Sequence, residues 1–279
     1  MINYNGNITS GKNVLSVENR GFLYGDGVFE TVKIAEGRIL FLEDHYFRLM
    51  SSMRILRMEI PMDFTMEFFA LQIISLAEAE GCAASARARI TVYRRDGGRY
   101  LPTSRNISFL VTAKPLEFDT YQFLNSEYEV DLYKDFFVPA QLLSTLKTTN
   151  RIINITGSIY AGENNLDNCL LLNQDKNVIE ALNGNIFMLT ANTLITPPMS
   201  DGCLNGIMRK QVLAIARKIP DLEVVEQSIS TFDLQKGDEL FITNVISGIR
   251  PVTKYRKKTY GYKFSEELTS RLNEMTRIS

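Results

Sequence analysis

The sequence of 279 residues contains a single histidine, His45. A Ser-His-Asp triad, or a metal centre with several histidines, would have to be built around that one ring. We therefore predict no metal site, and any catalysis must rely on lysine, tyrosine, carboxylates or a cofactor.

Cysteine is also scarce. The three cysteines, Cys82, Cys169 and Cys203, are far apart and odd in number, so they form neither a disulfide framework nor a CxxC metal motif. The first residues lack the basic and apolar stretches of a signal peptide, and no apolar run approaches the ~20 residues of a membrane span. We predict a cytoplasmic protein with no membrane partner.

No excess of charge of one sign is present. There are 31 basic and 32 acidic side chains, and the longest basic run is Arg256–Lys258, which is typical of a solvated hairpin end. A nucleic-acid partner is therefore not expected. Apolar residues make up 45% of the chain, which is ordinary for a globular protein, and the length allows two modest domains or one large one.

The first part of the chain mixes strands and helices. Alternation and turn residues predict strands at 2–4, 28–35, 38–42, 86–94 and 107–113. Helical spacing predicts one helix from an N-cap at Asp44 to about Leu56 and a second from Asp63 to Gly81. Residues 115–125 interrupt the pattern, so we predict an N-terminal domain at 1–114, a linker at 115–125 and a C-terminal domain at 126–279.

The second part continues the mixture. Strands are predicted at 128–132, 169–172, 178–182, 186–190 and 240–244, and helices at 149–162, 207–219 and 265–276. Strands and helices do not alternate strictly as they do in a doubly wound sheet. The fold class is therefore α+β.

Lys147 is the residue with the most informative surroundings. It lies between the apolar residues 142–146, read as a strand, and the start of the helix predicted at 149–162. Partial burial there would lower the pKa of the lysine amine and make it a nucleophile and base. Such an amine can form a Schiff base with an aldehyde cofactor, whereas Lys147 taken alone would be read as a surface lysine.

Three further segments give this lysine a context. They are Arg20–Thr31 (RGFLYGDGVFET), Val178–Phe187 (VIEALNGNIF) and Asn205–Arg209 (NGIMR). With Lys147, and over roughly residues 2–255, the sequence resembles the class IV aminotransferases, the fold-type-IV enzymes that use pyridoxal 5'-phosphate (PLP). The resemblance implies two α/β-type domains, the N-terminal one smaller, with the cofactor between them. It also implies a homodimer and a small amine or amino-acid substrate.

The resemblance implies a role for each residue around PLP. Lys147 forms the Schiff base, and Glu180 keeps the pyridine nitrogen protonated within a motif that Asn185 and Phe187 complete. The phosphate is bound by residues that supply amides, a cation and a hydroxyl, namely Ile207, Met208, Arg48 and Thr243. Taken singly, Glu180 could be a hairpin carboxylate, Arg48 an exposed helix arginine and Gly206–Ile207 an empty helix start.

Residues of the substrate pocket are expected near the turn Tyr24–Gly27, which lacks the third glycine of a dinucleotide-binding motif. The resemblance implies six pocket residues: Tyr24, Phe29, Thr31, Lys33, Arg99 and Asn244. Phe29 could equally belong to the core. The charges of residues 94–100 could equally belong to a solvated turn.

Three details favour the aminodeoxychorismate lyase branch of the family: the spacing Lys147-x-x-Asn150-Arg151 and the segments 204–209 and 239–252. This activity, of the folate pathway, would release pyruvate and 4-aminobenzoate from 4-amino-4-deoxychorismate. Residues 29–33 also resemble D-amino-acid aminotransferases. The alternative is therefore an aminotransferase that acts on branched-chain or D-amino acids with 2-oxoglutarate, and a non-catalytic interaction module is a remote third reading.

Overall fold

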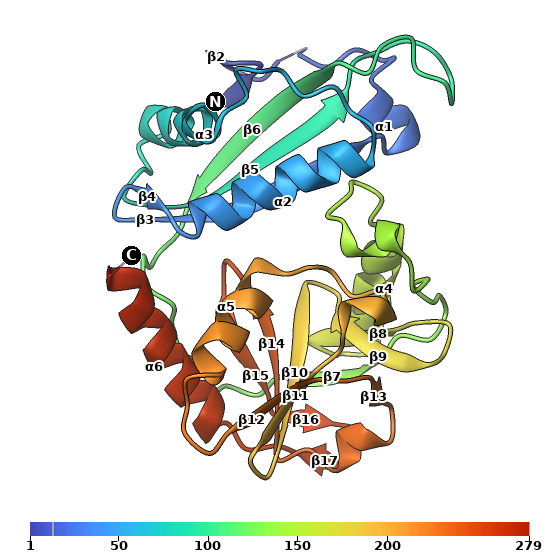
Figure 1. Ribbon diagram of the computed structural model, residues 1–279, viewed down its shortest axis with the longest axis vertical. Coiled ribbons are helices and arrows are strands. Elements are labelled where there is room, and N and C mark those ends of the chain that lie inside the picture. Colours follow the sequence, from blue (N-terminus) through green and yellow to red (C-terminus); the bar gives the residue numbers. More distant parts are fainter. Residues whose placement is uncertain (13, 279) are drawn as a thin grey trace. The chain divides into compact units, whose positions relative to one another are not determined.

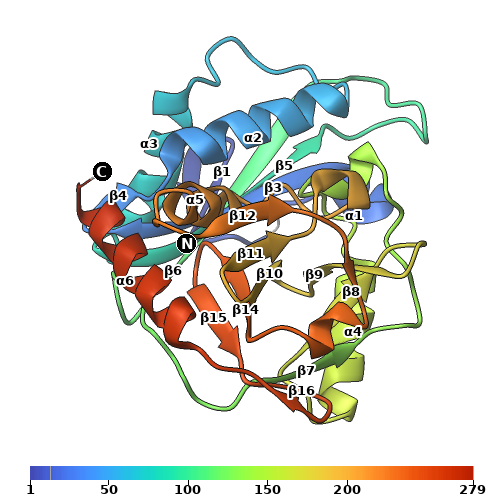
Figure 2. The ribbon, with the colours of Figure 1, turned by 60° about the horizontal axis from the view of Figure 1, so that its bottom comes forward.

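The computed structural model describes residues 1–12 and 14–278 and divides into two compact units. The first comprises Met1–Thr120 together with Lys147–Asn150. The second comprises Tyr121–Leu146 and the chain from Arg151 onward. Figures 1 and 2 show the elements of each unit, and each unit is described by itself below.

In the first unit, the described residues form a six-stranded sheet of order β2-β1-β6-β5-β3-β4. Its strands are β1 (Ile2–Tyr4), β2 (Asn7–Thr9), β3 (Gly27–Ala35), β4 (Arg38–Ile39), β5 (Ser85–Arg94) and β6 (Ile107–Pro115). Its helices are α1 (Arg20–Tyr24), α2 (Leu42–Ile55) and α3 (Met66–Ala79).

One face of this sheet carries the core of the first unit. Val28 and Val32 of β3 and Ile90 of β5 belong there to one buried cluster with Leu49 of α2 and Ile73 of α3. Figure 1 shows these two helices beside the sheet. The other face carries the alternate residues of both strands, which are largely polar. The predicted alternation of β5 is confirmed, and it gives the sheet one apolar and one polar face.

Residues 147–149 return to this sheet although they follow the second unit's first strand in sequence. The Phe29 amide donates to the Lys147 carbonyl and the Thr149 amide to the Gly27 carbonyl, both at 2.9 Å. The segment therefore pairs in an antiparallel sense with the beginning of β3, through Val28 and Thr148. The pairing brings Lys147 beside Phe29.

The surroundings predicted for Lys147 were partly wrong. Leu142–Thr145 form a 3-10 turn (η1) rather than an apolar strand, and Leu142 and Leu143 are exposed. Helix α4 begins at Ile152, three residues after the predicted start, because residues 147–149 are extended along β3. Lys147 itself is half-buried.

Two helix starts also differ from prediction. Phe41, with φ of 57°, lies in the left-handed region, so β4 ends at Ile39 and α2 begins at Leu42, which places Asp44 in the first turn. Helix α3 is capped by Thr65 rather than Asp63, because the Thr65 hydroxyl accepts from the Phe68 amide.

The described part of the second unit contains a larger sheet. Its strands are β7 (Glu129–Leu132), β8 (Asn168–Leu172), β9 (Asn177–Ala181), β10 (Gly184–Thr190), β11 (Thr193–Thr196), β12 (Glu223–Glu226), β13 (Ile229–Ser230), β14 (Glu239–Asn244), β15 (Gly248–Val252), β16 (Lys254–Tyr255) and β17 (Lys258–Thr259). Its helices are η1, α4 (Ile152–Glu163), η2 (Met199–Asp201), α5 (Ile207–Ala216), η3 (Asp233–Gln235) and α6 (Lys263–Ile278).

Three strands at the centre of this sheet matter for the site. β10 pairs with β9 on one side and with β14 on the other, both antiparallel. Helix α5 packs against β14, and α6 lies along β15 and α5 (Figure 2). Among residues 1–12 and 14–278, no helix has both the length and the apolar character needed to cross a membrane.

Candidate functional site

A row of three polar side chains crosses the sheet of the second unit. Asn185 of β10 lies directly opposite Glu180 of β9 on one side and Thr243 of β14 on the other. Directly paired residues of neighbouring strands point to the same face, so the three side chains form one row. All three are at least nine-tenths buried.

The turn before α5 is fastened to this row. The Leu204 amide donates to Glu180 Oε2 at 2.8 Å, and Asn185 Nδ2 donates to the Leu204 carbonyl at 2.9 Å. Two residues further on, a Cβ atom added at Gly206 would overlap Asn185 Oδ1. Because nothing larger than hydrogen fits there, only glycine allows this approach of turn and strand.

The N-terminus of α5 has the features of an anion site. Its N-cap, Gly206, offers no side-chain hydrogen bond, and no acidic residue stands in the first turn. The side chains of Ile207 and Met208 are buried, and the amides of the first turn of a helix have no acceptor within the helix. Thr243 Oγ1 is buried and finds no hydrogen-bond partner among the described residues. Amides and a hydroxyl of this kind suit a phosphate group.

Three charged or polar side chains, those of Glu30, His45 and Arg48, meet in the first unit. Glu30 of β3 receives Arg48 of α2 in a two-pronged ion pair, with Nε 2.7 Å from Oε1 and one terminal nitrogen 2.6 Å from Oε2. His45 Nδ1 lies 2.7 Å from the same Oε2. Glu30 and His45 are buried, and the Arg48 side chain is 11% exposed.

The ion pair determines the ionisation of Glu30. Burial raises the pKa of this carboxyl, but the attraction of Arg48 and the hydrogen bonds from His45 and Arg48 outweigh burial and lower the pKa to about 2. Burial lowers the pKa of His45 below its ordinary value of 6.5, against the opposing effect of Glu30. The group is therefore a carboxylate, a guanidinium and a neutral imidazole at pH 7.

Lys147 lies on the polar face of the first unit's sheet. Its Nζ is 4.7 Å from the centroid of the Phe29 ring, and the guanidinium carbon of Arg89 is 3.7 Å from the same centroid. Thr31 is paired with Arg89 across β3 and β5, and so shares this face. Phe29 is thus the ring around which two cations gather, rather than a member of the apolar core.

The amine of Lys33, a predicted pocket residue, contacts the segment that follows β6. Its Nζ donates to the Phe118 carbonyl at 2.8 Å, and burial lowers its pKa. Asn244 has a structural use as well. Its Oδ1 accepts from the amides of Ile246 and Ser247, which fixes the turn between β14 and β15.

Tyr24 and Arg99 belong to a separate cluster around Arg20. Asp26 Oδ2 accepts from Arg20 Nε at 2.8 Å, and a terminal nitrogen of Arg20 donates to the Arg99 carbonyl at 2.6 Å. The Tyr24 ring lies 5.9 Å from the Tyr100 ring. The side chain of Arg99 is exposed, so its anchored part is the backbone.

The sequence interpretation missed Glu30, His45 and Arg89 as site residues. His45 and Arg48 are three residues apart on α2, a spacing that places both on one helix face. Glu30 falls on the opposite side of β3 from Phe29 by strand alternation. These two periodicities could have predicted that the three charged or polar side chains meet.

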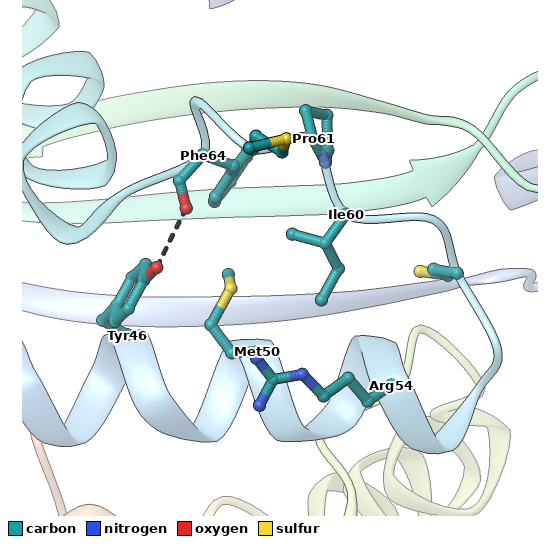
Figure 3. A pocket seen from close by; sticks show the side chains of 8 residues that line it. Tyr46, Met50, Arg54, Ile60, Pro61 and Phe64 are labelled. Carbon is teal, nitrogen blue, oxygen red and sulfur yellow. Dashed lines mark hydrogen bonds between the residues drawn. The ribbon is translucent and has the colours of Figure 1, made fainter.

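A shallow pocket of about 430 Å³ is also present in the first unit (Figure 3). It lies between α2 and the following loop, and the Tyr46 hydroxyl donates to the Phe64 carbonyl across it. Its lining residues are Tyr46, Met50, Arg54, Met58, Ile60, Pro61, Met62 and Phe64. None of the predicted site residues is among them.

Comparisons with known proteins identify the family of this chain. The model of the amino-transferase class IV family matches residues 27–255, so the chain belongs to that family. It is therefore an enzyme of this family, and the predicted recognition and fold class are confirmed.

Two curated relatives show how the family divides. A protein of Methanocaldococcus jannaschii, provisionally named branched-chain-amino-acid aminotransferase, is 29% identical over 93% of this chain and 89% of its own length. An aminodeoxychorismate lyase of Bacillus subtilis is 26% identical over 98% of this chain and 92% of its own length. Lyases and aminotransferases are thus represented at comparable identity.

A solved structure supports the fold. The branched-chain aminotransferase of the thermophilic archaeon Thermoproteus uzoniensis, crystallised with norvaline, matches 99% of this chain and 94% of its own with a TM-score of 0.86. The sequence identity is 22%, so the likeness is one of fold. Another branched-chain amino acid aminotransferase with the same identity and a TM-score of 0.88 was solved in complex with N-(5'-phosphopyridoxyl)-L-glutamate.

Proposed function

We propose that the chain is a PLP-dependent enzyme that acts on a small primary amine. The observation that carries this proposal is the buried hydroxyl of Thr243, which finds no partner among the described residues. Thr243 lies in one row with Glu180, on the strand β14 against which α5 packs. A buried hydroxyl without a partner costs free energy, and a phosphate oxygen would satisfy it.

PLP, when bound, supplies an aldehyde that reacts with amines and a ring that takes up electrons from a broken bond. Each residue then has one task. Glu180 holds a proton at the pyridine nitrogen. Thr243, the amides of Ile207 and Met208, and Arg48 bind the phosphate. The row spans two strand spacings, roughly 10 Å, which separates the acidic end from the hydroxyl end.

The remaining tasks fall to Lys147. Its amine would hold the aldehyde of the cofactor, and it would serve as the base that takes a proton from the amine-bearing carbon of the substrate. Phe29 holds the lysine chain at one side, since Nζ lies 4.7 Å from its ring centroid. Tyr24, Thr31, Lys33, Arg99 and Asn244 remain proposed pocket residues. For Lys33 and Asn244 the observed hydrogen bonds also provide a structural role.

For the substrate we propose 4-amino-4-deoxychorismate, with release of pyruvate and 4-aminobenzoate. The supporting feature is the three-residue step from Lys147 to Asn150. Asn150 Nδ2 donates to the Gly25 carbonyl at 3.0 Å, and Thr149 Oγ1 donates to the same carbonyl at 2.8 Å. These two hydrogen bonds hold the segment 147–150 against the turn that precedes β3.

A single pair of assays tests this choice. The purified protein with PLP is given aminodeoxychorismate alone, and separately an L-branched-chain or D-amino acid with 2-oxoglutarate. Formation of pyruvate and 4-aminobenzoate without a keto acid supports the lyase. Glutamate formation that requires 2-oxoglutarate, with no aminobenzoate, supports the aminotransferase, which the relative from Methanocaldococcus jannaschii favours.

We also propose a cytoplasmic homodimer. Cys82, Cys169 and Cys203 are buried and form no disulfide, as suits a reducing compartment. Helix α4 exposes Ile152, Ile155 and Ile159 by 67%, 54% and 56%, a helical stripe of the kind that pairs with another chain. Sedimentation of the wild type as a dimer, and of Ile155→Lys as a monomer, is the expected result. A monomeric wild type contradicts it.

A further inference from the structure

His45 is fully buried, and its ring makes one identified hydrogen bond. Nδ1 lies 2.7 Å from Glu30 Oε2, whereas Nε2 is buried with no partner in the described part of the chain. An ionised carboxylate can only accept, so Nδ1 must carry the proton. The charged groups that act on the ring are Glu30, Arg48 and Lys147.

Glu30 is the hub of this group. It accepts one bond from His45 and two from Arg48, so both carboxylate oxygens are engaged. The two-pronged contact fixes the plane of the guanidinium as well as its position. The bond from His45 prevents the carboxylate from turning, because turning would break a buried hydrogen bond to a charged group.

The direction of Arg48 follows from this geometry. Nε and one terminal nitrogen face the buried carboxylate, so the other edge of the guanidinium points away from Glu30. Glu30 is 1% exposed and Arg48 is 11% exposed. Glu30 balances the charge of Arg48, so what this group provides is a fixed direction of the guanidinium rather than net positive charge.

We propose that His45 and Glu30 are positioning residues that aim Arg48 at the phosphate of the cofactor. This inference rests on the proposed function, because the phosphate is that of PLP. It assigns the only histidine of the chain to the orientation of a binding group and not to proton transfer.

The experiment compares two ligands that differ only in the phosphate. Dissociation constants of PLP and of pyridoxal are measured for the untagged wild type and for His45→Leu, His45→Asn and Arg48→Gln. His45→Leu should weaken PLP binding by about tenfold or more, the effect of a lost hydrogen bond to a charged group, and pyridoxal binding by less than about twofold. His45→Asn should restore PLP binding, because its amide can donate near the position of Nδ1.

A matched control separates positioning from folding. Met53 is fully buried on the same helix, and its side chain is apolar. Met53→Ala should lower the unfolding temperature while leaving the ratio of the two dissociation constants unchanged.

A second readout needs no variant. The untagged protein has a single histidine, so its imidazole nitrogens give one set of NMR signals. A neutral ring protonated on Nδ1 at pH 7, with a pKa below the ordinary 6.5, is expected. A ring that titrates near pH 6.5, or that carries its proton on Nε2, overturns the assignment.

The remaining outcomes are distinguishable. If His45→Leu binds PLP like the wild type, or loses both ligands equally, the positioning role is wrong while the proposed function stands. If the wild type binds no PLP, or Arg48→Gln does not distinguish PLP from pyridoxal, the assignment of the phosphate fails first, and this inference fails with it.

Discussion

The two groups of proposed cofactor-binding residues satisfy their polar atoms in different ways. In the first unit, Glu30 and Arg48 neutralise each other in a buried ion pair completed by His45. In the second unit, Thr243 Oγ1 has no partner among the described residues, and the start of α5 has no side-chain cap. The charges of the first group are paired without a ligand, whereas the hydroxyl and the helix start of the second group lack such partners among the described residues.

The difference suggests a division of labour. The desolvation cost of a buried ion pair can offset the attraction between its charges, but the pair fixes the positions of its side chains. The first unit therefore contributes the orientation of Arg48. Uncapped amides and an unpartnered hydroxyl gain hydrogen bonds only when a ligand arrives, so the second unit contributes affinity. The predictions below test whether the two groups can be separated in this way.

The largest effect is expected at Lys147. Lys147→Ala should lower turnover by more than about a thousandfold, because the nucleophile and base are lost together. Lys134, an exposed lysine, provides the control, and Lys134→Ala should retain wild-type turnover. Steady-state rates in the two assays above give the comparison. Appreciable turnover by Lys147→Ala would falsify the role proposed for this residue.

Glu180 should come next. Glu180→Gln keeps an oxygen that can accept from the Leu204 amide but cannot hold the proton of the pyridine nitrogen. We expect turnover to fall by roughly a hundredfold while PLP still binds. Rate and cofactor absorbance are measured on the same sample. A variant within threefold of the wild-type rate would remove Glu180 from the mechanism.

Two buried threonines offer a sharper test of the second unit. Thr243 and Thr196 are each 1% exposed, but Thr196 Oγ1 donates to the Ile186 carbonyl at 2.8 Å whereas Thr243 Oγ1 has no identified partner. Thr243→Val should weaken PLP binding about tenfold without lowering apoprotein stability.

Thr196→Val should do the reverse, with a loss of about 1 kcal/mol in the free energy of unfolding and unchanged PLP affinity. Urea unfolding of both apoproteins and titration with PLP measure the contrast. If the two variants behave alike, the hydroxyl of Thr243 does not bind the phosphate of PLP.

Glycine substitutions test the fit of the turn before α5. Gly206→Ala forces a Cβ against Asn185 Oδ1 and should cost about 1–3 kcal/mol of stability together with PLP affinity. Gly162→Ala, in α4 with nothing within 4 Å of the new atom, should stabilise by up to about 1 kcal/mol. Thermal unfolding of the two variants is compared. A tolerated Gly206→Ala would show that the turn is loose.

The smallest effect concerns pH. The pKa of His45 is lowered in the folded state, so stability is fully present above pH 6.5 and is lost as the pH falls below it. Glu30, with a pKa of about 2 against an ordinary 4.5, loses its contribution only below pH 4.5. Between pH 7.5 and 5.5, wild-type stability should fall by at most about 1.4 kcal/mol per pH unit, and less in His45→Asn. Equal slopes in urea unfolding would contradict a neutral buried ring.

Much of this fold could be predicted from sequence because its signals are local. The alternation of residues 86–94 gave β5 a polar and an apolar face, and helical spacing placed α2, α3 and α5 within a few residues. The helix starts at Leu42 and Met66 were missed because they depend on a left-handed Phe41 and on the choice between two caps, Asp63 and Thr65.

The site was less accessible to sequence reasoning because it depends on pairing between distant strands. The row of Glu180, Asn185 and Thr243 exists only through the register of β9, β10 and β14. The return of residues 147–149 to β3 likewise leaves no periodic signal in so short a segment. The family resemblance supplied the residues, and the structure supplied their alignment within each unit.

The central claim is that the proposed PLP cofactor is attached to Lys147. Borohydride reduction of the protein with PLP, followed by peptide mass spectrometry, tests it most directly. We expect the pyridoxyl group on the peptide that contains Lys147, at one per chain, and a reduced yield in Thr243→Val. A pyridoxyl group on another lysine, or on none, would contradict the account.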